Sequence, residues 1–357
     1  MTATFALPFP LILENGGVLD DVTVAYRTWG RLDADRANAV LICHALTGNA
    51  DADEWWEPLI GSGRALDPAR DFLICSNILG SCYGTTGPSA SAGEFPRITV
   101  RDIVAVQRAL VRHLGVRRLK LVIGGSFGGM QVLEWALSAP DAVEAIAPIA
   151  TNGRHSPWTI AWSEAQRQAI ALDPIRGLAI ARMIAMSTYR SHASYQSRFA
   201  RAHDGRSFAV EQWLRRHGDR LVARFDAKTY VTLTHAMDSH DVARGRGAYE
   251  TVLASITQPA LVVSIDSDIL YPPAEQEELA LLIPNATLRS IHSPHGHDGF
   301  LIDAAEIGAV VTEWRSRLSN VPRLRVIPRA GTESLSVKQG TPALTRGEDT
   351  RKKGVRS

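Results

Sequence analysis

Short runs of apolar residues recur along the chain, separated by stretches in which apolar positions return with the helical period. Seven runs have the length and composition of buried strands: Val22–Thr28, Ala39–Cys43, Phe72–Asn77, Leu119–Ile123, Ala145–Ala150, Ala260–Ile265 and Thr287–Ile291. Strands that alternate with helices favour crossover connections and a mostly parallel sheet. The pattern therefore predicts an α/β fold.

The helical stretch at 99–114 carries its own start and stop signals. Thr99 is a suitable N-cap, and Asp102 at the third helical position approximates a capping box. Gly115 is a natural stop signal, and apolar residues share one helix face at Ile103, Val106, Leu110 and Leu114. A further helix is predicted at about 303–318.

The alternation is interrupted between about residues 154 and 250, where a stretch rich in Arg, Ala, Trp and Met predicts several helices. A helical insertion beyond the carboxyl end of a strand would cover the edge where open α/β sheets bind ligands. We therefore expect residues 1–153 and 251–320 to form the two parts of a core, and 154–250 to form a helical lid. Residues 321–357 lose this periodicity and are expected to be a disordered basic tail.

The composition is that of a globular protein without a nucleic-acid surface. Of the 357 residues, 45% are hydrophobic and 21% are charged, which is ordinary for a globular domain. The formal net charge is +2, but residues 320–357 hold nine Lys and Arg against three Asp and Glu. The rest of the chain is therefore slightly acidic, which argues against nucleic acid as a partner.

Cysteine usage and the lack of targeting signals favour a cytoplasmic location. Cys43, Cys75 and Cys82 are too few for a disulfide framework and lack zinc-ligand spacing, so no metal site is expected. The N-terminus lacks the pattern of a signal peptide, and no apolar stretch approaches the roughly 18 residues of a membrane span. No membrane partner is therefore expected.

One pentapeptide carries the strongest chemical signal. Gly124-Gly125-Ser126-Phe127-Gly128 has the form G-x-S-x-G, directly after the apolar run at 119–123 and directly before an amphipathic stretch. In this strand–turn–helix setting the motif indicates a nucleophile elbow, which exposes the serine hydroxyl at a helix N-terminus. Ser126 is therefore the candidate nucleophile.

A nucleophilic serine needs a base and an acid that orients the base, and in α/β hydrolases these follow in the order Asp or Glu, then His. Asp268 comes just after the apolar run at 260–265, and His297 lies in the loop after the next run. Asp266 and His295 have equivalent positions relative to the strand ends. From position alone, the acid and the base therefore each keep two candidates.

Acyl transfer also requires hydrogen-bond donors for the developing oxyanion. The elbow supplies the backbone N–H of Phe127. The second donor should come from the loop after an earlier strand, where His44-Ala45-Leu46-Thr47-Gly48 follows the run at 39–43. We expect the N–H of Leu46 to be this donor.

Longer motifs surround these residues: HALTG at 44–48, NILGSCYGTTGP at 77–88, GGSFGGMQ at 124–131, LYPP at 270–273 and GHD at 296–298. In these motifs, and over about residues 10–318, the chain resembles the homoserine O-acetyltransferase family. The resemblance implies an α/β-hydrolase fold and ping-pong transfer of an acyl group from acyl-CoA to homoserine. It favours acetyl-CoA as co-substrate, implies no permanently bound cofactor, and maps the catalytic triad onto Ser126, Asp268 and His297.

The resemblance also implies residues that bind the amino-acid acceptor, namely Arg182, Tyr189 and Asp298. Arg182 and Tyr189 are seven residues apart in a helical stretch, so they share one helix face. A guanidinium can clamp an α-carboxylate through two hydrogen bonds, with the phenol as an additional donor. Asp298 maps to the acceptor for the substrate ammonium. The family further implies a homodimer formed through the lid.

The chain departs from the family pattern at three places. Phe127 stands where Met is usual, Ser81 stands where Gly is usual, and the connection after Pro174 is nearly absent. We expect Phe127 to lie beside the acyl site and the short connection to lie on the lid, positions from which they could alter acyl-group size or acceptor choice. The open alternatives are a succinyl donor, serine as acceptor, and an esterase or thioesterase without acceptor recognition.

Other residues near the expected site are interpreted as structural. Trp55 and Trp56 are expected to pack at the mouth of the site. Arg154, His155 and Arg167 are interpreted as exposed basic residues at the base of the lid, with contact to the CoA phosphates as the alternative.

Overall fold

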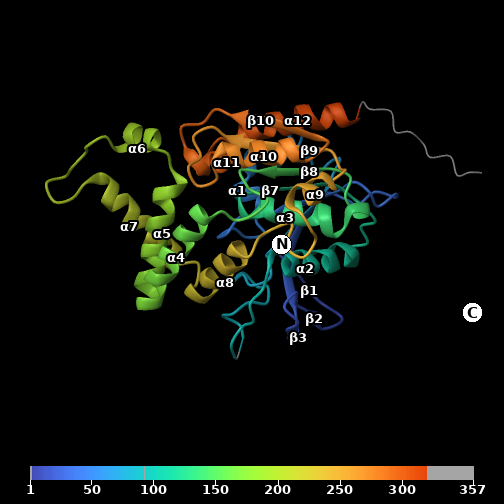
Figure 1. The fold of residues 1–357 in the computed structure, drawn as a ribbon, viewed down its shortest axis with the longest axis horizontal. Coiled ribbons are helices and arrows are strands. Elements are labelled where there is room, and N and C mark those ends of the chain that lie inside the picture. Colours follow the sequence, from blue (N-terminus) through green and yellow to red (C-terminus); the bar gives the residue numbers. More distant parts are fainter. Residues whose placement is uncertain (1, 92, 320–357) are drawn as a thin grey trace, which may run out of the picture. The chain divides into compact units, whose positions relative to one another are not determined.

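The structure, a computed structural model, describes residues 2–91 and 93–319. The predicted basic tail lies outside these residues. Met1–Leu318 form one compact unit, in which helices cover both faces of a central sheet (Figure 1).

Eight strands form the central sheet: β1 (Ala3–Ala6), β4 (Thr23–Trp29), β5 (Ala39–Cys43), β6 (Phe72–Ser76), β7 (Leu119–Gly125), β8 (Ile146–Ile149), β9 (Ala260–Ile265) and β10 (Ala286–Ile291). Their spatial order is β1-β4-β6-β5-β7-β8-β9-β10. Strand β4 runs antiparallel to both of its neighbours, and the strands from β6 to β10 are parallel. All seven predicted strands belong to this sheet. Strand β1 and the separate hairpin of β2 (Leu11–Ile12) and β3 (Val18–Leu19) were not predicted.

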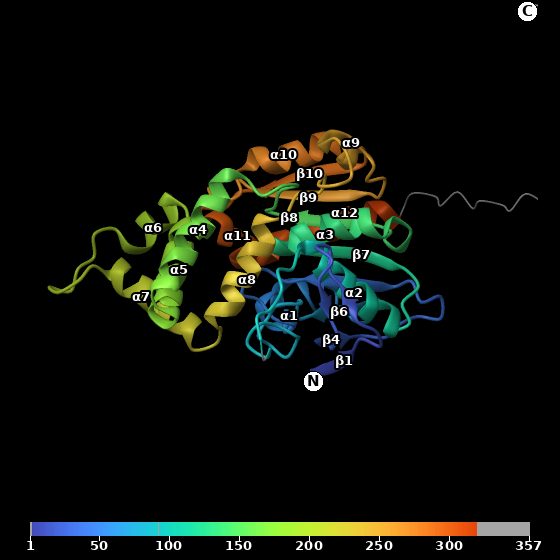
Figure 2. The same cartoon turned by 60° about the horizontal axis from the view of Figure 1, so that its bottom comes forward.

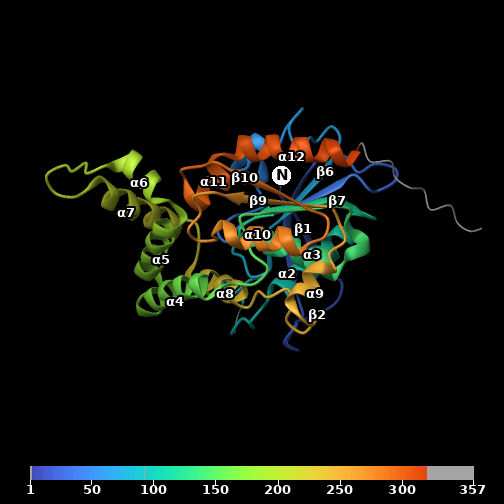
Figure 3. The ribbon, with the colours of Figure 1, turned by 45° about the horizontal axis from the view of Figure 1, so that its top comes forward.

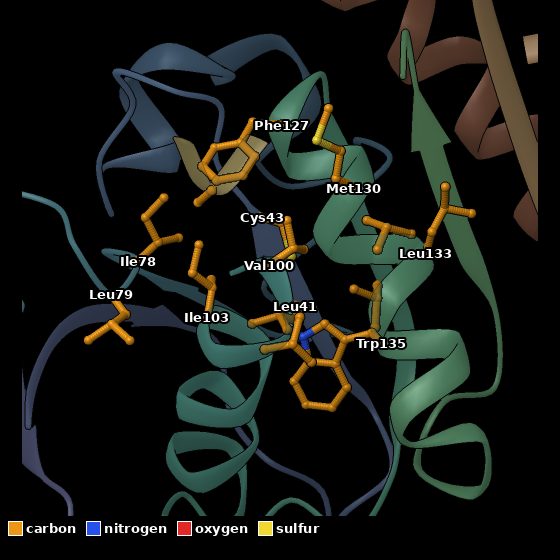
Figure 4. Close-up of a cluster of buried hydrophobic side chains, with 14 of the residues drawn as sticks. Leu41, Cys43, Ile78, Leu79, Val100, Ile103, Phe127, Met130, Leu133 and Trp135 are labelled. Carbon is orange, nitrogen blue, oxygen red and sulfur yellow. The ribbon is translucent and has the colours of Figure 1, made fainter. Parts of the chain in front are cut away.

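Successive side chains of a strand point to opposite faces, so the sheet separates two hydrophobic cores. In β5, Leu41 and Cys43 belong to one core, whereas Val40 and Ile42 belong to the other. The core around Leu41 and Cys43 is closed by side chains of α2 (Val100–His113) and α3 (Phe127–Ser138), as Figure 4 shows.

The remaining core helices divide between the two faces. Helices α9 (Tyr249–Ala254) and α10 (Pro273–Leu282) join α2 and α3 in the first core, and α1 (Ala52–Trp55), α11 (Gly299–Ile302) and α12 (Ala304–Ser319) contribute to the second. Figure 3 shows α12 on one side of the strands and α2 and α3 on the other. Single turns of 3₁₀-helix occur at Glu57–Leu59, Pro140–Ala142 and Gly296–Asp298.

The predicted capping box of α2 is confirmed. Thr99 Oγ1 accepts a hydrogen bond from the N–H of Asp102 at 3.3 Å, and Asp102 Oδ2 accepts one from the N–H of Thr99 at 2.8 Å. Helix α12 confirms the helix predicted at 303–318 to within one residue. The amphipathic character expected after the elbow is wrong. Residues Phe127–Ala136 of α3 are all buried, because α3 packs between the sheet and α2.

Between β8 and β9 the chain forms a set of helices that we call the helical insertion: α4 (Pro157–Leu172), α5 (Pro174–Tyr189), α6 (His192–Phe199), α7 (Ala209–Val222) and α8 (Ala227–Asp238). It projects from one end of the sheet, as Figures 1 and 2 show. Helix α5 is its centre, packed against α4, α7 and α8.

The turn between α4 and α5 explains the short connection in the sequence. Asp173 alone separates the two helices, and its carboxylate caps α5 by accepting the N–H groups of Ile175 and Arg176 at 2.9 Å. The helices then lie so close that a Cβ on Gly177 would be 2.1 Å from the carbonyl oxygen of Ala169. No helix among the described residues has the length and apolar content that a membrane crossing requires.

Candidate active site

Ser126 lies at the sharp turn between β7 and α3. Its φ of 57° and ψ of −123° are strained for a residue that carries a Cβ. The turn also approaches β5 closely, because a Cβ on Gly128 would lie 2.1 Å from the carbonyl oxygen of Cys43. Gly128 is therefore required because a side chain at this position would not fit. The strained turn holds the candidate nucleophile at the carboxyl end of β7.

Ser126 faces a cavity of about 480 Å³. The walls come from the loop after β5, from the helical insertion, and from the segment around α11. Most of the residues predicted for the site line this cavity together: Leu46, Ser126, Arg182, Tyr189, His297 and Asp298. Asp268 is 3% exposed and lies behind His297.

The structure pairs one of the two candidate acids with one of the two candidate bases. His297 Nδ1 lies 2.7 Å from Asp268 Oδ2. Asp266 pairs instead with His292, and His295 Nδ1 lies 3.3 Å from Ser194 Oγ. Because the carboxylate accepts the proton on Nδ1, neutral His297 keeps Nε2 free as a base.

Asp268 is itself held in place by its own loop. Its second oxygen accepts the backbone N–H groups of Leu270 at 2.8 Å and Tyr271 at 2.9 Å. Both carboxylate oxygens of Asp268 therefore have hydrogen-bond partners. The loop 268–271 fixes the orientation of this carboxylate, which in turn orients the His297 ring.

The two expected oxyanion donors remain available. Within residues 2–91 and 93–319, the N–H groups of Leu46 and Phe127 have no hydrogen-bond acceptor. The loop that carries Leu46 is braced by His44, whose Nδ1–H donates to Ala45 O at 2.8 Å and whose Nε2 accepts the N–H of Ile78 at 3.2 Å. Burial lowers the pKa of His44 to about 4, so the imidazole stays neutral, as these two bonds require.

The expectation that the Phe127 side chain lies beside the acyl site is wrong. This side chain is fully buried in the core, near Cys43 and Met130 (Figure 4), and is absent from the cavity wall. Phe127 is the first residue of α3, and its backbone forms part of the turn while its side chain packs in the core. The α4–α5 turn at Asp173 does not line the cavity either.

Arg182 and Tyr189 lie on one face of α5 and both reach the cavity. The guanidinium carbon of Arg182 is 5.4 Å from the centre of the Tyr189 ring, which is 5.7 Å from that of His297. Among the described residues Arg182 has no carboxylate partner, so its charge is available to an anion. Burial raises the pKa of Tyr189, which keeps its hydroxyl protonated and able to donate.

Two arginines near the cavity were not predicted from the sequence. Arg190 Nε lies 2.8 Å from Asp298 Oδ2, with both side chains 14% exposed. Arg224 lines the cavity and donates to Thr47 O and to the Tyr83 hydroxyl at 2.7 Å. These contacts join positions more than 100 residues apart in sequence. No local pattern indicates them.

The interpretation of the basic residues at the base of the lid is wrong for two of the three. The side chains of His155 and Arg167 are 1% and 9% exposed and do not line the cavity. Arg154 is exposed and stacks over Tyr249 at 4.2 Å. Of the tryptophans, Trp55 lines the cavity, whereas Trp56 is fully buried.

Comparisons with known proteins identify the family. Residues 38–304 match the family model of the alpha/beta hydrolase fold. The chain is 58% identical over 341 residues to homoserine O-acetyltransferase of Trichormus variabilis, covering 89% of this chain and 95% of that relative. The chain belongs to the homoserine O-acetyltransferase family of α/β hydrolases. The family and fold class predicted from the sequence are thereby confirmed.

Solved structures of this family and of related hydrolases share the fold. Homoserine O-acetyltransferase from Bacillus anthracis is similar with 26% identity and a TM-score of 0.82, over 88% of this chain and 96% of that chain. An acetylester hydrolase from Corynebacterium glutamicum is similar with 26% identity and a TM-score of 0.79, over 88% of this chain and 95% of that chain.

Proposed function

We propose that this protein transfers an acetyl group from acetyl-CoA to the hydroxyl of L-homoserine, a step of methionine biosynthesis. The observation that carries the proposal is the guanidinium of Arg182, which has no carboxylate partner among the described residues and lines the cavity that contains Ser126 and His297. An esterase needs a nucleophile and a base, whereas transfer to an amino acid also needs a receptor for the α-carboxylate. The 58% identity to a relative named homoserine O-acetyltransferase supports this assignment.

In the first half-reaction, Ser126 Oγ attacks the thioester carbonyl while His297 Nε2 takes the hydroxyl proton. The imidazolium is stabilised by Asp268, and the oxyanion by the N–H groups of Leu46 and Phe127. Collapse of the tetrahedral intermediate breaks the C–S bond. The sulfur leaves as the CoA thiol with the proton from His297, and the acetyl group remains on Ser126.

In the second half-reaction, the homoserine hydroxyl attacks the acetyl-serine and gives its proton to His297. The second tetrahedral intermediate collapses, the proton returns to Ser126 Oγ, and O-acetylhomoserine leaves. Both half-reactions use the same base and the same oxyanion donors, as expected for a ping-pong mechanism that passes through an acyl-enzyme.

Acceptor recognition is assigned to three side chains that line the cavity. Arg182 would bind the α-carboxylate through two hydrogen bonds, with Tyr189 donating a third. Asp298 would accept a hydrogen bond from the substrate ammonium through Oδ1, since Arg190 contacts Oδ2.

We propose that residues 154–250 act as a lid, so that the core consists of residues 1–153 and 251–320. Such a lid would favour transfer over hydrolysis by excluding water.

Two features support the remaining parts of the proposal. Cys43, Cys75 and Cys82 are free thiols, which supports a cytoplasmic location. Leu172, Ile175 and Ile180 are 90%, 67% and 45% exposed on α4 and α5, which suits a homodimer formed through the lid. A monomeric mass in light scattering at micromolar concentration would contradict the dimer.

A CoA-release assay that crosses acetyl- and succinyl-CoA with homoserine and serine tests the proposed function. We expect acetyl-CoA with homoserine to give the highest kcat/KM. Dominance of succinyl-CoA or of serine would move the assignment to the corresponding acyltransferase. CoA release that does not depend on either amino acid would favour the second candidate function, a serine esterase or thioesterase. The similarity to an acetylester hydrolase is the observation that favours this second candidate.

A further inference from the structure

A buried polar chain connects the helical insertion to the loop that carries Asp268. The hydroxyl of Tyr271 lies 3.1 Å from His155 Nε2, and His155 Nδ1 lies 3.1 Å from Asp238 Oδ1. Arg167 Nη1 then lies 2.7 Å from the other oxygen of Asp238. His155 precedes α4, Arg167 lies on α4, and Asp238 ends α8.

The protons in this chain have a defined direction. The Asp238 carboxylate can only accept, so His155 Nδ1–H donates to it, and in the tautomer with this single ring proton Nε2 accepts. The donor to Nε2 is therefore the Tyr271 hydroxyl, whose pKa is raised well above its ordinary value by burial. The chain thus fixes the position of the Tyr271 hydroxyl from the insertion side.

Tyr271 touches the candidate triad at two points. Its backbone N–H donates to Asp268 Oδ1 at 2.9 Å, and its ring centre lies 5.0 Å from that of His297. A shift of Tyr271 would therefore move both the acid and the base. A second contact holds the same loop, because Trp158 Nε1 on α4 donates to Ile269 O at 2.8 Å.

We propose that His155 and Tyr271 are positioning residues for the Asp268–His297 pair, and that Asp238 and Arg167 hold His155 for this role. The proposal rests on the triad assigned under the proposed function. None of the four residues lines the cavity, so they act through Asp268 and His297 and not on the substrate. The helical insertion would then support the triad from behind as well as cover the cavity.

Tyr271→Phe is the most direct test, since it removes one hydroxyl and keeps the ring against His297. We expect kcat for acetyl transfer to fall about tenfold with KM for homoserine and acetyl-CoA unchanged, because a small misplacement of catalytic groups lowers turnover and not binding. The rate at which a fluorophosphonate probe labels Ser126 should fall by a similar factor. That probe reports the activated serine without any acyl donor or acceptor.

His155→Phe tests the other end of the same hydrogen bond. We expect the single variants and the double variant His155→Phe/Tyr271→Phe to have similar kcat values, because all three lack the same contact. Tyr249→Phe is the matched control. Its hydroxyl, in a residue 7% exposed, lies 3.1 Å from Glu278 on the neighbouring helix α10, and its loss should leave kcat unchanged.

Wild-type labelling and turnover in Tyr271→Phe would overturn the proposal, as would additive losses in the double variant. A lowered melting temperature with normal kcat for the folded enzyme would show that the chain only anchors the insertion, which also overturns it. If the wild type is labelled at Ser126 but releases no CoA, the proposed function fails while the labelling comparison still decides this proposal. If Ser126 of the wild type is not labelled, the triad assignment and this proposal fail together.

Discussion

At the scale of single residues, the proposed role of Arg182 is what would distinguish acyl transfer to an amino acid from simple hydrolysis. It presents a charge to the cavity that no carboxylate of the described residues neutralises, and it stacks near Tyr189 at 5.4 Å. Burying a guanidinium that no carboxylate neutralises is costly, which supports the proposal that an anionic ligand supplies the negative charge.

We predict that Arg182→Ala raises KM for homoserine by about 10- to 100-fold, the loss expected for a charge-assisted hydrogen bond worth roughly 1.5–3 kcal/mol. Labelling of Ser126 by acetyl-CoA in the absence of homoserine should stay at the wild-type rate. Initial-velocity kinetics and single-turnover acylation measure the two effects. Arg216→Ala, an exposed site on α7, is the control. Unchanged KM for homoserine in Arg182→Ala would remove Arg182 from acceptor binding.

Candidate site residues that lie within a local sequence motif could be predicted. Residues whose contacts are with partners distant in the sequence could not. Ser126 sits in a pentapeptide whose chemistry depends on its immediate neighbours. His155 and Arg190 take their roles from Tyr271 and Asp298, which lie more than 100 positions away. The sequence around His155 looks like any basic lid segment, because its burial is decided only when α4 and α8 pack together.

At the scale of elements, continuous apolar runs made the parallel strands predictable. All five residues of β5 are buried, as expected for a strand covered on both faces. Strand β1 escaped prediction because only one of its four residues is buried at the sheet edge. The surroundings of α3 were misjudged for a related reason, since its periodicity does not reveal that α2 covers its outer face.

Gly177 tests how closely α4 and α5 must pack. We predict that Gly177→Ala costs roughly 2 kcal/mol in the free energy of unfolding, because its Cβ would meet the backbone oxygen of Ala169 at 2.1 Å. Since α5 carries Arg182 and Tyr189, KM for homoserine should rise as well. Urea denaturation and steady-state kinetics give both values. The same substitution at Gly93, where nothing lies within 4 Å of an added Cβ, should change neither. A wild-type unfolding curve for Gly177→Ala would mean that the helices separate without cost.

At the scale of the whole molecule, the loops of the candidate site and the helical insertion are held in place by buried polar contacts as well as by apolar packing. Histidines take part at both places. His44 braces the loop with Leu46 against Ile78, and His240 Nε2 lies 3.2 Å from Asn152 O where the insertion meets the core. Burial lowers the pKa of each from 6.5 to about 4, so both are neutral in the folded enzyme.

These two histidines make the stability of the enzyme sensitive to mild acid. Below pH 6.5 the unfolded chain binds a proton at each, whereas the folded protein binds none until about pH 4. The unfolded state therefore holds more protons in this window, and the free energy of unfolding falls as the pH drops from 6.5 to 4, by up to roughly 3 kcal/mol for each histidine.

Urea titrations at half-unit pH steps measure the slope of the free energy of unfolding against pH. His240→Gln keeps an N–H for Asn152 O and should reduce the slope by about one proton, whereas His192→Gln, at an exposed position on α6, should leave it unchanged. An equal slope in wild type and His240→Gln would mean that His240 binds its proton equally well in the folded and unfolded states.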